Sequence, residues 1–400
     1  MMSTGETDDA LASLARDAEV AAPHDLAGLF AACGRELGAD DVLVYVTDLQ
    51  QRVLQPLLDP TPTAAQAALP VLGVDGTLAG RAYQTVQPQL QLTDDGRTRV
   101  WLPLGIGSLR LGVLVAVVAD PPDDEQVEAL QRLAAAAAVL LQAKSVYGDT
   151  VVRLRRSHHL GVAAELHYSV LPPLSFSGAQ VTVSAALEPC YEVAGDVIDY
   201  SVDPGRTQVA IFDGMGHGLH SAQCAVFTVA AYRCARRAGL GLVEVLDSVD
   251  EALVEGLGGE LFSTAVMADL DTTTGLLHWV NAGHPPPLLL RGGKVVKALD
   301  TEPRPPLGLG HLLADETWEI GEEQLEPGDM VLLYTDGVVE ARAPDGELFG
   351  VERLAELVRV QLAGGLDTAE TMRRVVRELL SHHAGQLSDD ATLLMLEWRR

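Results

Sequence analysis

Cysteine is scarce in this sequence, with four residues in 400, and no two of them have the CxxC spacing. A zinc site or a disulfide framework would need such a pattern, so a reducing compartment is expected. The N-terminus is acidic and has no apolar segment typical of a signal peptide. The apolar runs near 111–119 and 133–141 are shorter than the roughly 20 residues that span a bilayer. We therefore expect a soluble, cytoplasmic protein.

Basic residues are also few: 28 Lys and Arg stand against 56 Asp and Glu, for a net charge of −28. Nucleic acid and anionic membranes are therefore not expected as partners, because both bind basic surfaces. Solubility explains most of this acidity. A smaller part is explained if some carboxylates are gathered to bind cations.

The chain is too long for one ordinary core, so two domains are the default expectation. We predict an N-terminal tail at 1–22, a small domain at 23–143, a helical linker at 144–173 and a larger domain at 174–400. Both domains are predicted to be α+β. In the small domain we expect helices at 26–37, 76–85 and 123–143, and strands at 42–47, 53–58, 100–104 and 109–119 around an antiparallel sheet.

Apolar residues recur at intervals of three, four or seven through the end of the small domain and the linker. They are Leu130, Leu133, Ala137, Leu140, Tyr147, Val151 and Leu154. Two parallel helices bury such a seam against each other, which predicts a homodimer through the linker helix. The same pattern also fits a helix lying on its own domain. The helix must end by Leu171, which precedes Pro172 and Pro173.

The larger domain alternates apolar strand patterns with helices. Helices are predicted at 221–238, 242–257, 351–362 and 368–382. Strands are predicted at 181–187, 208–212, 264–269, 276–281, 288–290, 330–334 and 392–398. Many strands with helices grouped between them indicate an α+β sandwich and argue against a parallel sheet.

Four aspartates of the larger domain adjoin apolar strand patterns: Asp196, Asp213, Asp336 and Asp389. We expect the ends of buried strands to deliver these carboxylates, often beside a glycine that permits close backbone approach. Carboxylates gathered at one point repel each other unless a cation neutralises them. Oxygen ligands favour Mg²⁺ or Mn²⁺ over zinc. Two such ions would activate water and clamp a phosphoryl oxygen, which predicts a phosphohydrolase.

An ordinary turn is the alternative explanation for some of these residues, since Asp-Gly is the commonest hairpin-turn dipeptide. The chain has five Asp-Gly pairs, at Asp75, Asp95, Asp213, Asp336 and Asp345. Polar residues surround Asp75, Asp95 and Asp345, which we interpret as plain turns. The apolar strands that precede Asp213 and Asp336 favour a ligand role for both.

An ordered series of motifs from about Glu165 to Trp398 resembles one family. The series is Glu165-Leu166 with Leu171-Pro172-Pro173, Val193-Ala194-Gly195-Asp196, Asp213-Gly214-Met215-Gly216-His217-Gly218, Phe262-Ser263-Thr264-Ala265, Asn281-Ala282-Gly283-His284-Pro285, Pro306-Leu307-Gly308, Leu325-Glu326-Pro327-Gly328-Asp329, Tyr334-Thr335-Asp336-Gly337 and Ser388-Asp389-Asp390-Ala391-Thr392. It is similar to the metal-dependent (type 2C) protein serine/threonine phosphatases, in the SpoIIE-like bacterial branch that regulates sigma factors and sporulation.

The resemblance implies an αββα sandwich with two Mn²⁺ or Mg²⁺ ions between its sheets. Asp213 would bridge both ions, with a further ligand in the Gly214 carbonyl. Asp196 would complete one metal shell, and Asp336 and Asp389 the other, with the adjacent Asp390 as reserve. The substrate would be a phosphoserine or phosphothreonine on a protein, by analogy an anti-sigma-factor antagonist.

Two histidines in these motifs have open roles. His217 could act as general acid toward the leaving serine oxygen, because the pKa of histidine lies near neutrality. A turn histidine bonded to loop backbone is an equal alternative. We interpret His284 as a residue that terminates a strand and shapes the sheet end or the substrate rim.

The small domain resembles a GAF-type sensor through Gly76-Thr77-Leu78-Ala79-Gly80, Trp101-Leu102-Pro103-Leu104 and Leu111-Gly112-Val113-Leu114. These are packing signatures, so the small ligand or partner of the sensor stays unknown. The leading interpretation is a phosphatase regulated by its sensor. The alternatives are a catalytically silent signalling scaffold and a metal phosphohydrolase of small molecules.

Overall fold

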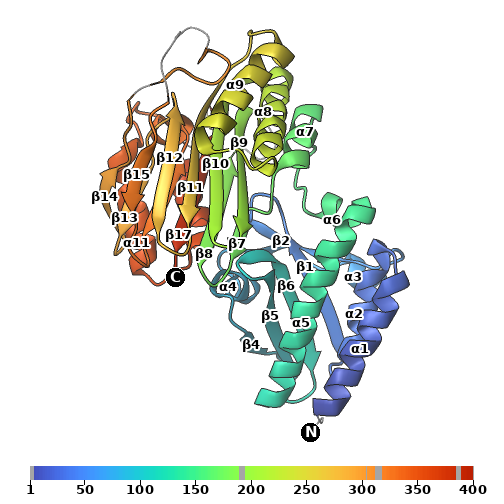
Figure 1. Cartoon of the computed structure of the whole chain (residues 1–400). Helices are drawn as coiled ribbons and strands as arrows, with labels where there is room; N and C mark the ends of the chain where they lie inside the picture. The colour runs from blue at the N-terminus through green and yellow to red at the C-terminus, as the bar shows by residue number, and fades with distance from the viewer. Residues whose placement is uncertain (1–3, 189–193, 303, 311–317, 384–388, 400) are drawn as a thin grey trace. The chain divides into compact units, whose positions relative to one another are not determined.

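The computed structural model describes residues 4–188, 194–302, 304–310, 318–383 and 389–399. The chain divides into two compact units, Met1–His159 and Leu160–Arg400 (Figure 1). The division falls inside the segment 144–173 that we expected to link the two domains. Residues 144–159 therefore pack with the N-terminal unit.

An antiparallel sheet forms the centre of the N-terminal unit, in the strand order β3-β2-β1-β6-β5-β4. The strands are β1 (Asp41–Thr47), β2 (Val53–Leu57), β3 (Leu72–Gly73), β4 (Gln89–Leu92), β5 (Thr98–Ile106) and β6 (Leu109–Val118). The α+β class and the antiparallel sheet predicted for this unit are confirmed. The short edge strands β3 and β4 were not predicted.

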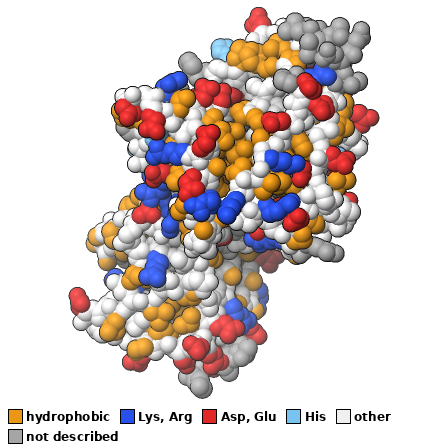
Figure 2. Space-filling model, turned by 90° about the vertical axis from the view of Figure 1, so that its left-hand side faces the viewer, with side chains coloured by type: hydrophobic (Ala, Val, Ile, Leu, Met, Phe, Trp, Pro, Cys, Tyr) orange, Lys and Arg blue, Asp and Glu red, His pale blue; other side chains and the backbone are white. Residues whose placement is uncertain are grey.

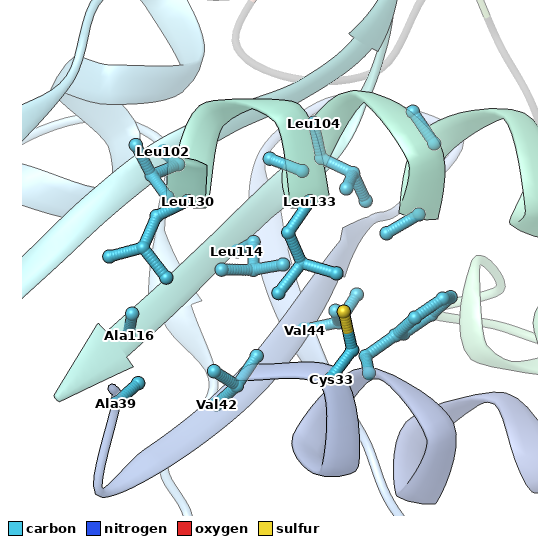
Figure 3. Packing of buried hydrophobic residues seen from close by; sticks show 14 of the residues in the cluster. Cys33, Ala39, Val42, Val44, Leu102, Leu104, Leu114, Ala116, Leu130 and Leu133 are labelled. Atoms are coloured by element: carbon cyan, nitrogen blue, oxygen red, sulfur yellow. The ribbon is translucent and has the colours of Figure 1, made fainter. Parts of the chain in front are cut away.

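Alternate residues of these strands enter different cores, as the twofold period of a strand requires. On one face, Val42, Val44 and Leu114 pack against Leu130 and Leu133 of the long helix α5 (Asp124–Lys144), as Figure 3 shows. The same core takes in helices α1 (Thr4–Val20) and α2 (Leu26–Glu36). The opposite face packs on α4 (Leu78–Thr85) in a core that contains aromatic residues from both: Tyr45 and Trp101 of the strands and Tyr83 of the helix.

The apolar residues that recur through α5 and the linker pack largely inside this unit. Leu130, Leu133, Ala137 and Val151 are all buried in the α5 core. The segment also breaks into a 3-10 turn at Ser145–Tyr147 and helices α6 (Asp149–Leu154) and α7 (Val162–Val170). These four residues therefore fit the second interpretation, in which the helix packs on its own domain.

Strands of the C-terminal unit form two antiparallel sheets in its described part. The first, which we name the β10 sheet, has the order β15-β12-β11-β10-β9. Its strands are β9 (Ala194–Asp203), β10 (Arg206–His217), β11 (Ser263–Asp271), β12 (Leu276–Ala282) and β15 (Gly321–Gln324). The second, the β17 sheet, has the order β14-β13-β16-β17-β8-β7. Its strands are β7 (Ser175–Ser177), β8 (Val181–Glu188), β13 (Leu288–Arg291), β14 (Lys294–Ala298), β16 (Met330–Tyr334) and β17 (Ala391–Trp398).

Three apolar cores define the layers of this unit. One lies between the two sheets and includes Val183, Ile211 and Leu394. A second joins the β10 sheet to helices α8 (Leu219–Arg237) and α9 (Leu242–Leu257). A third joins the β17 sheet to helices α11 (Gly350–Ala363) and α12 (Thr368–His382). The predicted αββα sandwich is confirmed.

Charged side chains of both signs are interspersed on the face of the C-terminal unit seen in Figure 2, with an apolar area between them. Among the described residues, no helix has both the length and the apolar character needed to cross a bilayer.

Candidate functional site

The first pair of predicted site residues lies on neighbouring strands of the β10 sheet. Asp196 of β9 is the cross-strand partner of Asp213 of β10. Asp196 is almost fully buried, and Asp213 is half-buried. We expected Asp213 at the end of its strand, and this is wrong: β10 continues to His217, with an irregular register after Asp213.

Glycine permits close contact between these two strands. A Cβ on Gly195 would lie 1.9 Å from the carbonyl oxygen of Gly214 and 2.6 Å from Ser221 Oγ. No side chain fits in that space, which explains a glycine beside Asp196. The Gly214 carbonyl, predicted as a backbone ligand, accepts a hydrogen bond from Ser221 Oγ at 3.3 Å.

The β17 sheet contributes Asp336 through a short helix. Strand β16 ends at Tyr334, Thr335 takes an extended conformation, and Asp336 opens α10 (Asp336–Val339). The hydroxyl of Thr335 donates to Asp196 Oδ2 at 2.7 Å and accepts from the backbone N–H of Thr392 at 3.0 Å. This buried threonine therefore joins the two sheets at the site. Asp336-Gly337 forms no hairpin turn, in agreement with the interpretation made from its strand context.

Asp389 and Asp390 precede β17 and differ in exposure. The carboxylate of Asp389 is exposed and accepts the backbone N–H of Asp390 at 2.9 Å. Asp390 is only 5% exposed. Its carbonyl lies against Gly337, where a Cβ would approach within 1.9 Å. The residue held in reserve thus lies deeper than the predicted ligand.

The aspartates perturb one another's charge. Burial, followed by the carboxylates of Asp213 and Asp390, raises the pKa of Asp196 well above its usual value. Burial, followed by Asp336 and Asp389, raises the pKa of Asp213 to about 7. The pKa of Asp336 is also raised, by burial and then by Asp389. Acidic groups from both sheets therefore interact at one place.

The donor chemistry of this cluster fits a hard divalent cation. All the side chains in it are carboxylates, the ligands that Mg²⁺ and Mn²⁺ prefer, and their mutual repulsion would be relieved by positive charge. In the part of the chain that the structure describes, however, no three His, Cys, Asp or Glu side chains already form a metal cage. Asp196 and Asp213 are cross-strand neighbours, and Asp336 and Asp389 are near enough to raise the pKa of Asp213.

The structure describes the side chain of His284 but not that of His217. The backbone of His217 ends β10, while its side chain lies outside the described residues, so its role as general acid stays a prediction. His284 is 6% exposed, and burial lowers its pKa to about 3. Its ring lies between the sheets, bonded to Thr264 on one side and to the Tyr334 carbonyl on the other. A position on the substrate rim is therefore wrong for His284, because the ring is enclosed.

Several contacts near the site were not predicted from the sequence. Asp199, on the same strand as Asp196, is buried in ion pairs with Arg233 and Arg236. Arg233 also donates to the carbonyl of Val170 at the end of α7. On the same helix, buried His167 hydrogen-bonds to the backbone of Asp196. Arg233 and Arg236 lie three positions apart on α8 and so share one face of the helix. This pair of like charges is the sequence signal that could have suggested an acidic partner.

The fold and the site together define a class: an αββα sandwich with an acidic cluster where its two sheets meet. Residues 203–399 match the model of the family described as Stage II sporulation protein E (SpoIIE). The C-terminal unit accordingly carries the similarity of this chain to the SpoIIE family.

Curated relatives cover part of the chain. Protein IcfG of Synechocystis sp. is 27% identical over 244 residues, which are 54% of this chain and 37% of IcfG. Phosphoserine phosphatase RsbU of Bacillus subtilis is 25% identical over 235 residues, 59% of this chain and 68% of RsbU. Among solved structures, the RsbU and RsbW domains of Rv1364c from Mycobacterium tuberculosis are 26% identical, with a TM-score of 0.49 over 55% of this chain and 62% of that chain.

Proposed function

We propose that this protein is a metal-dependent protein serine/threonine phosphatase whose active site is the acidic cluster between the β10 and β17 sheets. One observation carries the proposal: carboxylates from distant parts of the chain meet where the two sheets adjoin. Asp196 and Asp213 stand opposite each other on β9 and β10, and Thr335, which directly precedes Asp336, donates a hydrogen bond to Asp196. The carboxylates of Asp336 and Asp389 also help to raise the pKa of Asp213. A protein tolerates such a cluster where a cation is to be bound. The name of its relative RsbU, a phosphoserine phosphatase, supports the same function.

The proposed ligand set follows from position. Asp213 is placed to interact with acidic groups of both sheets and would be shared between two ions, with the Gly214 carbonyl beside it. Asp196 would serve one ion, and Asp336 and Asp389 the other. When bound, two Mn²⁺ or Mg²⁺ ions would neutralise phosphoryl charge and make the attacking water more acidic. The protein's own contribution is to hold the carboxylates in place through Thr335 and the backbone around Gly195.

His217 would deliver a proton to the leaving serine or threonine oxygen, since histidine can change its protonation state near neutral pH. Buried His284 is unsuited to that step, because burial keeps its ring neutral and both ring nitrogens are hydrogen-bonded.

The proposed substrate is a phosphorylated protein of the anti-sigma-factor antagonist type. We further propose that the N-terminal unit is a GAF-like sensor that regulates the site in response to a small ligand or partner. The homodimer predicted through the linker stays a prediction, and burial of Leu130 and Leu133 within one unit weakens its original basis. Comparing the full chain with residues 160–400 in activity and in ultracentrifugation tests both regulation and dimerisation.

Hydrolysis assays test the proposed activity. The full chain, stripped of metal, is given a phosphoserine peptide, a phosphothreonine peptide or free phosphometabolites, with Mn²⁺, Mg²⁺ or EDTA. We expect metal-dependent release of phosphate from the peptides. Preference for the free metabolites would indicate the small-molecule enzyme. Absence of turnover in a folded protein would indicate the silent scaffold.

A further inference from the structure

His284 lies between the two sheets, in the chain segment that follows β12. Asn281 holds its backbone from both sides: the His284 N–H donates to Asn281 Oδ1, and Asn281 Nδ2 donates to the His284 carbonyl, each at 2.8 Å. Gly283 between them has a left-handed φ of +69°, which lets the chain turn back on itself. The ring is therefore carried on a fixed backbone.

The tautomer of His284 follows from its two partners. Nε2 lies 3.1 Å from the Tyr334 carbonyl oxygen, which can only accept, so Nε2 carries the hydrogen. In a neutral imidazole Nδ1 is then an acceptor, and the Thr264 hydroxyl, at 2.7 Å, donates to it. Each polar atom of the ring is used, one toward each sheet.

Both partners adjoin predicted metal ligands. Thr264 of β11 is the cross-strand neighbour of Asp213 in the β10 sheet. Tyr334 ends β16 in the β17 sheet and precedes Thr335, whose hydroxyl donates to Asp196. Since Asp196 faces Asp213 across β9 and β10, the contacts form a closed circuit at the site. This circuit runs through Asp196, Asp213, Thr264, His284, Tyr334 and Thr335.

We propose that His284 is a positioning residue that fixes the spacing of the two sheets at the acidic cluster and so sets the affinity of the site for divalent cations. The inference rests on the proposed function of this site. Asp213 lies in the β10 sheet, and Asp336 opens helix α10 directly after β16 of the β17 sheet. The spacing of the two sheets therefore sets the distance between these two carboxylates, on which a shared cation would depend. Thr335 provides one polar connection across that gap, and the Thr264–His284–Tyr334 bridge provides another. Groups that orient metal ligands usually change affinity 10- to 100-fold when they are removed.

Calorimetric titration of the metal-free full chain with Mn²⁺ tests this role. His284→Phe keeps a ring of similar size and removes both hydrogen bonds, and we expect its Kd for Mn²⁺ to rise about tenfold or more. Thr264→Val removes the hydroxyl and should weaken binding similarly. Thr264→Ser keeps the hydroxyl and therefore the bridge, so its Kd for Mn²⁺ should stay within about twofold of the wild-type value. The double variant His284→Phe/Thr264→Val should be no weaker than His284→Phe, because both changes break one bridge.

Ser184→Ala is the control for general loss of stability. It removes a buried hydrogen bond of 2.7 Å between Ser184 and Thr368, on the side of β8 that faces α12. We expect a lower melting temperature with unchanged Mn²⁺ affinity. Equal loss of affinity in this variant would overturn the positioning role, as would wild-type affinity in folded His284→Phe. If His284→Phe does not fold, the two Thr264 variants decide. Equal Mn²⁺ affinity of Thr264→Ser and Thr264→Val, both weaker than wild type, would overturn the positioning role.

Phosphate release measured on the same samples separates this inference from the proposed function. Suppose that the wild type hydrolyses no phosphopeptide but the bridge variants bind Mn²⁺ more weakly than it does. This result would support the positioning role and reject the phosphatase. An active wild type whose bridge variants bind Mn²⁺ normally would support the phosphatase and reject the positioning role.

Discussion

Asp196 and Asp213 stand directly opposite each other on antiparallel strands, with their backbones paired in register. Like charges at opposed positions destabilise a sheet. Here Asp196 is also buried and Asp213 half-buried, and the Thr335 hydroxyl donates a hydrogen bond to Asp196 at 2.7 Å. The arrangement is unfavourable while both carboxylates are charged, and either a proton or a bound cation relieves the repulsion.

Metal-free protein should lose stability as pH rises. The pKa of Asp213 is raised from 3.8 to about 7, so the folded state binds the proton more tightly than the unfolded state. The resulting stabilisation is full below about pH 4 and is lost as pH passes through about 7. In EDTA, the free energy of unfolding of Asp213→Asn minus that of wild type should therefore increase from pH 5 to pH 8. A difference independent of pH would contradict the charge repulsion at this site.

Removal of the Asp213 carboxylate should abolish metal-dependent turnover. We expect Asp213→Asn to reduce Mn²⁺-dependent hydrolysis of a phosphopeptide by about a hundredfold or more, the usual scale for loss of one electrostatic group from an active site. Asp345→Asn is a matched control, because Asp345 also precedes a glycine but lies in an exposed turn. It should retain wild-type turnover. An active Asp213→Asn would exclude this residue from the metal shell.

The carboxylate of Asp199 should stabilise the fold without taking part in the chemistry. It is 2% exposed and pairs with both Arg233 and Arg236, so its neutralisation leaves two partly buried arginines without their carboxylate. Asp199→Asn should lower the free energy of unfolding by about 3 kcal/mol. The exposed pair of Glu356 and Arg359 offers the control, since Glu356→Gln should change stability by less than about 1 kcal/mol. Urea denaturation of both variants measures the contrast, and equal effects would refute it.

Two glycine-to-alanine changes should act in opposite directions. Gly195→Ala places a methyl group against the Gly214 carbonyl and should destabilise by about 1–3 kcal/mol while reducing Mn²⁺ affinity. Gly28→Ala lies in an exposed part of helix α2, with its nearest neighbour atom at 3.5 Å, and should stabilise by about 0.5–1 kcal/mol. Thermal unfolding with and without Mn²⁺ measures whether each variant is more or less stable than wild type. A neutral Gly195→Ala would mean that β9 and β10 can separate.

The helices with strong apolar patterns were predicted well from sequence. Helices α9 and α12 and strand β16 have the predicted bounds, because an amphipathic period or a continuous apolar run marks them. Strand β9 was not predicted as a strand. Its sequence, Ala194–Asp203, contains a glycine and three aspartates, which disfavour strands, and pairing with β10 overrides that preference.

Sequence predicted the acidic residues of the site better than the groups that hold them. The apolar strand before Asp213 was visible, whereas the bond from Thr335 to Asp196 joins residues 139 positions apart. No local pattern encodes such a contact. The same holds for His284, since its ring position depends on Thr264 and Tyr334 in two different sheets. Ligand roles remain predictions, and the supporting contacts are findings of the fold.

Strand β17 lies between β16 and β8, inside its sheet, although it is formed by residues 391–398. A ribosome must therefore synthesise nearly all of this sequence before the β17 sheet can close. Until then β8 and β16 present unpaired edges and apolar faces to solvent, a state prone to aggregation. The N-terminal unit has no such delay, because its own sheet is complete by residue 118. Folding during translation should thus be sequential, with the N-terminal unit formed while the C-terminal sandwich still lacks its last strand.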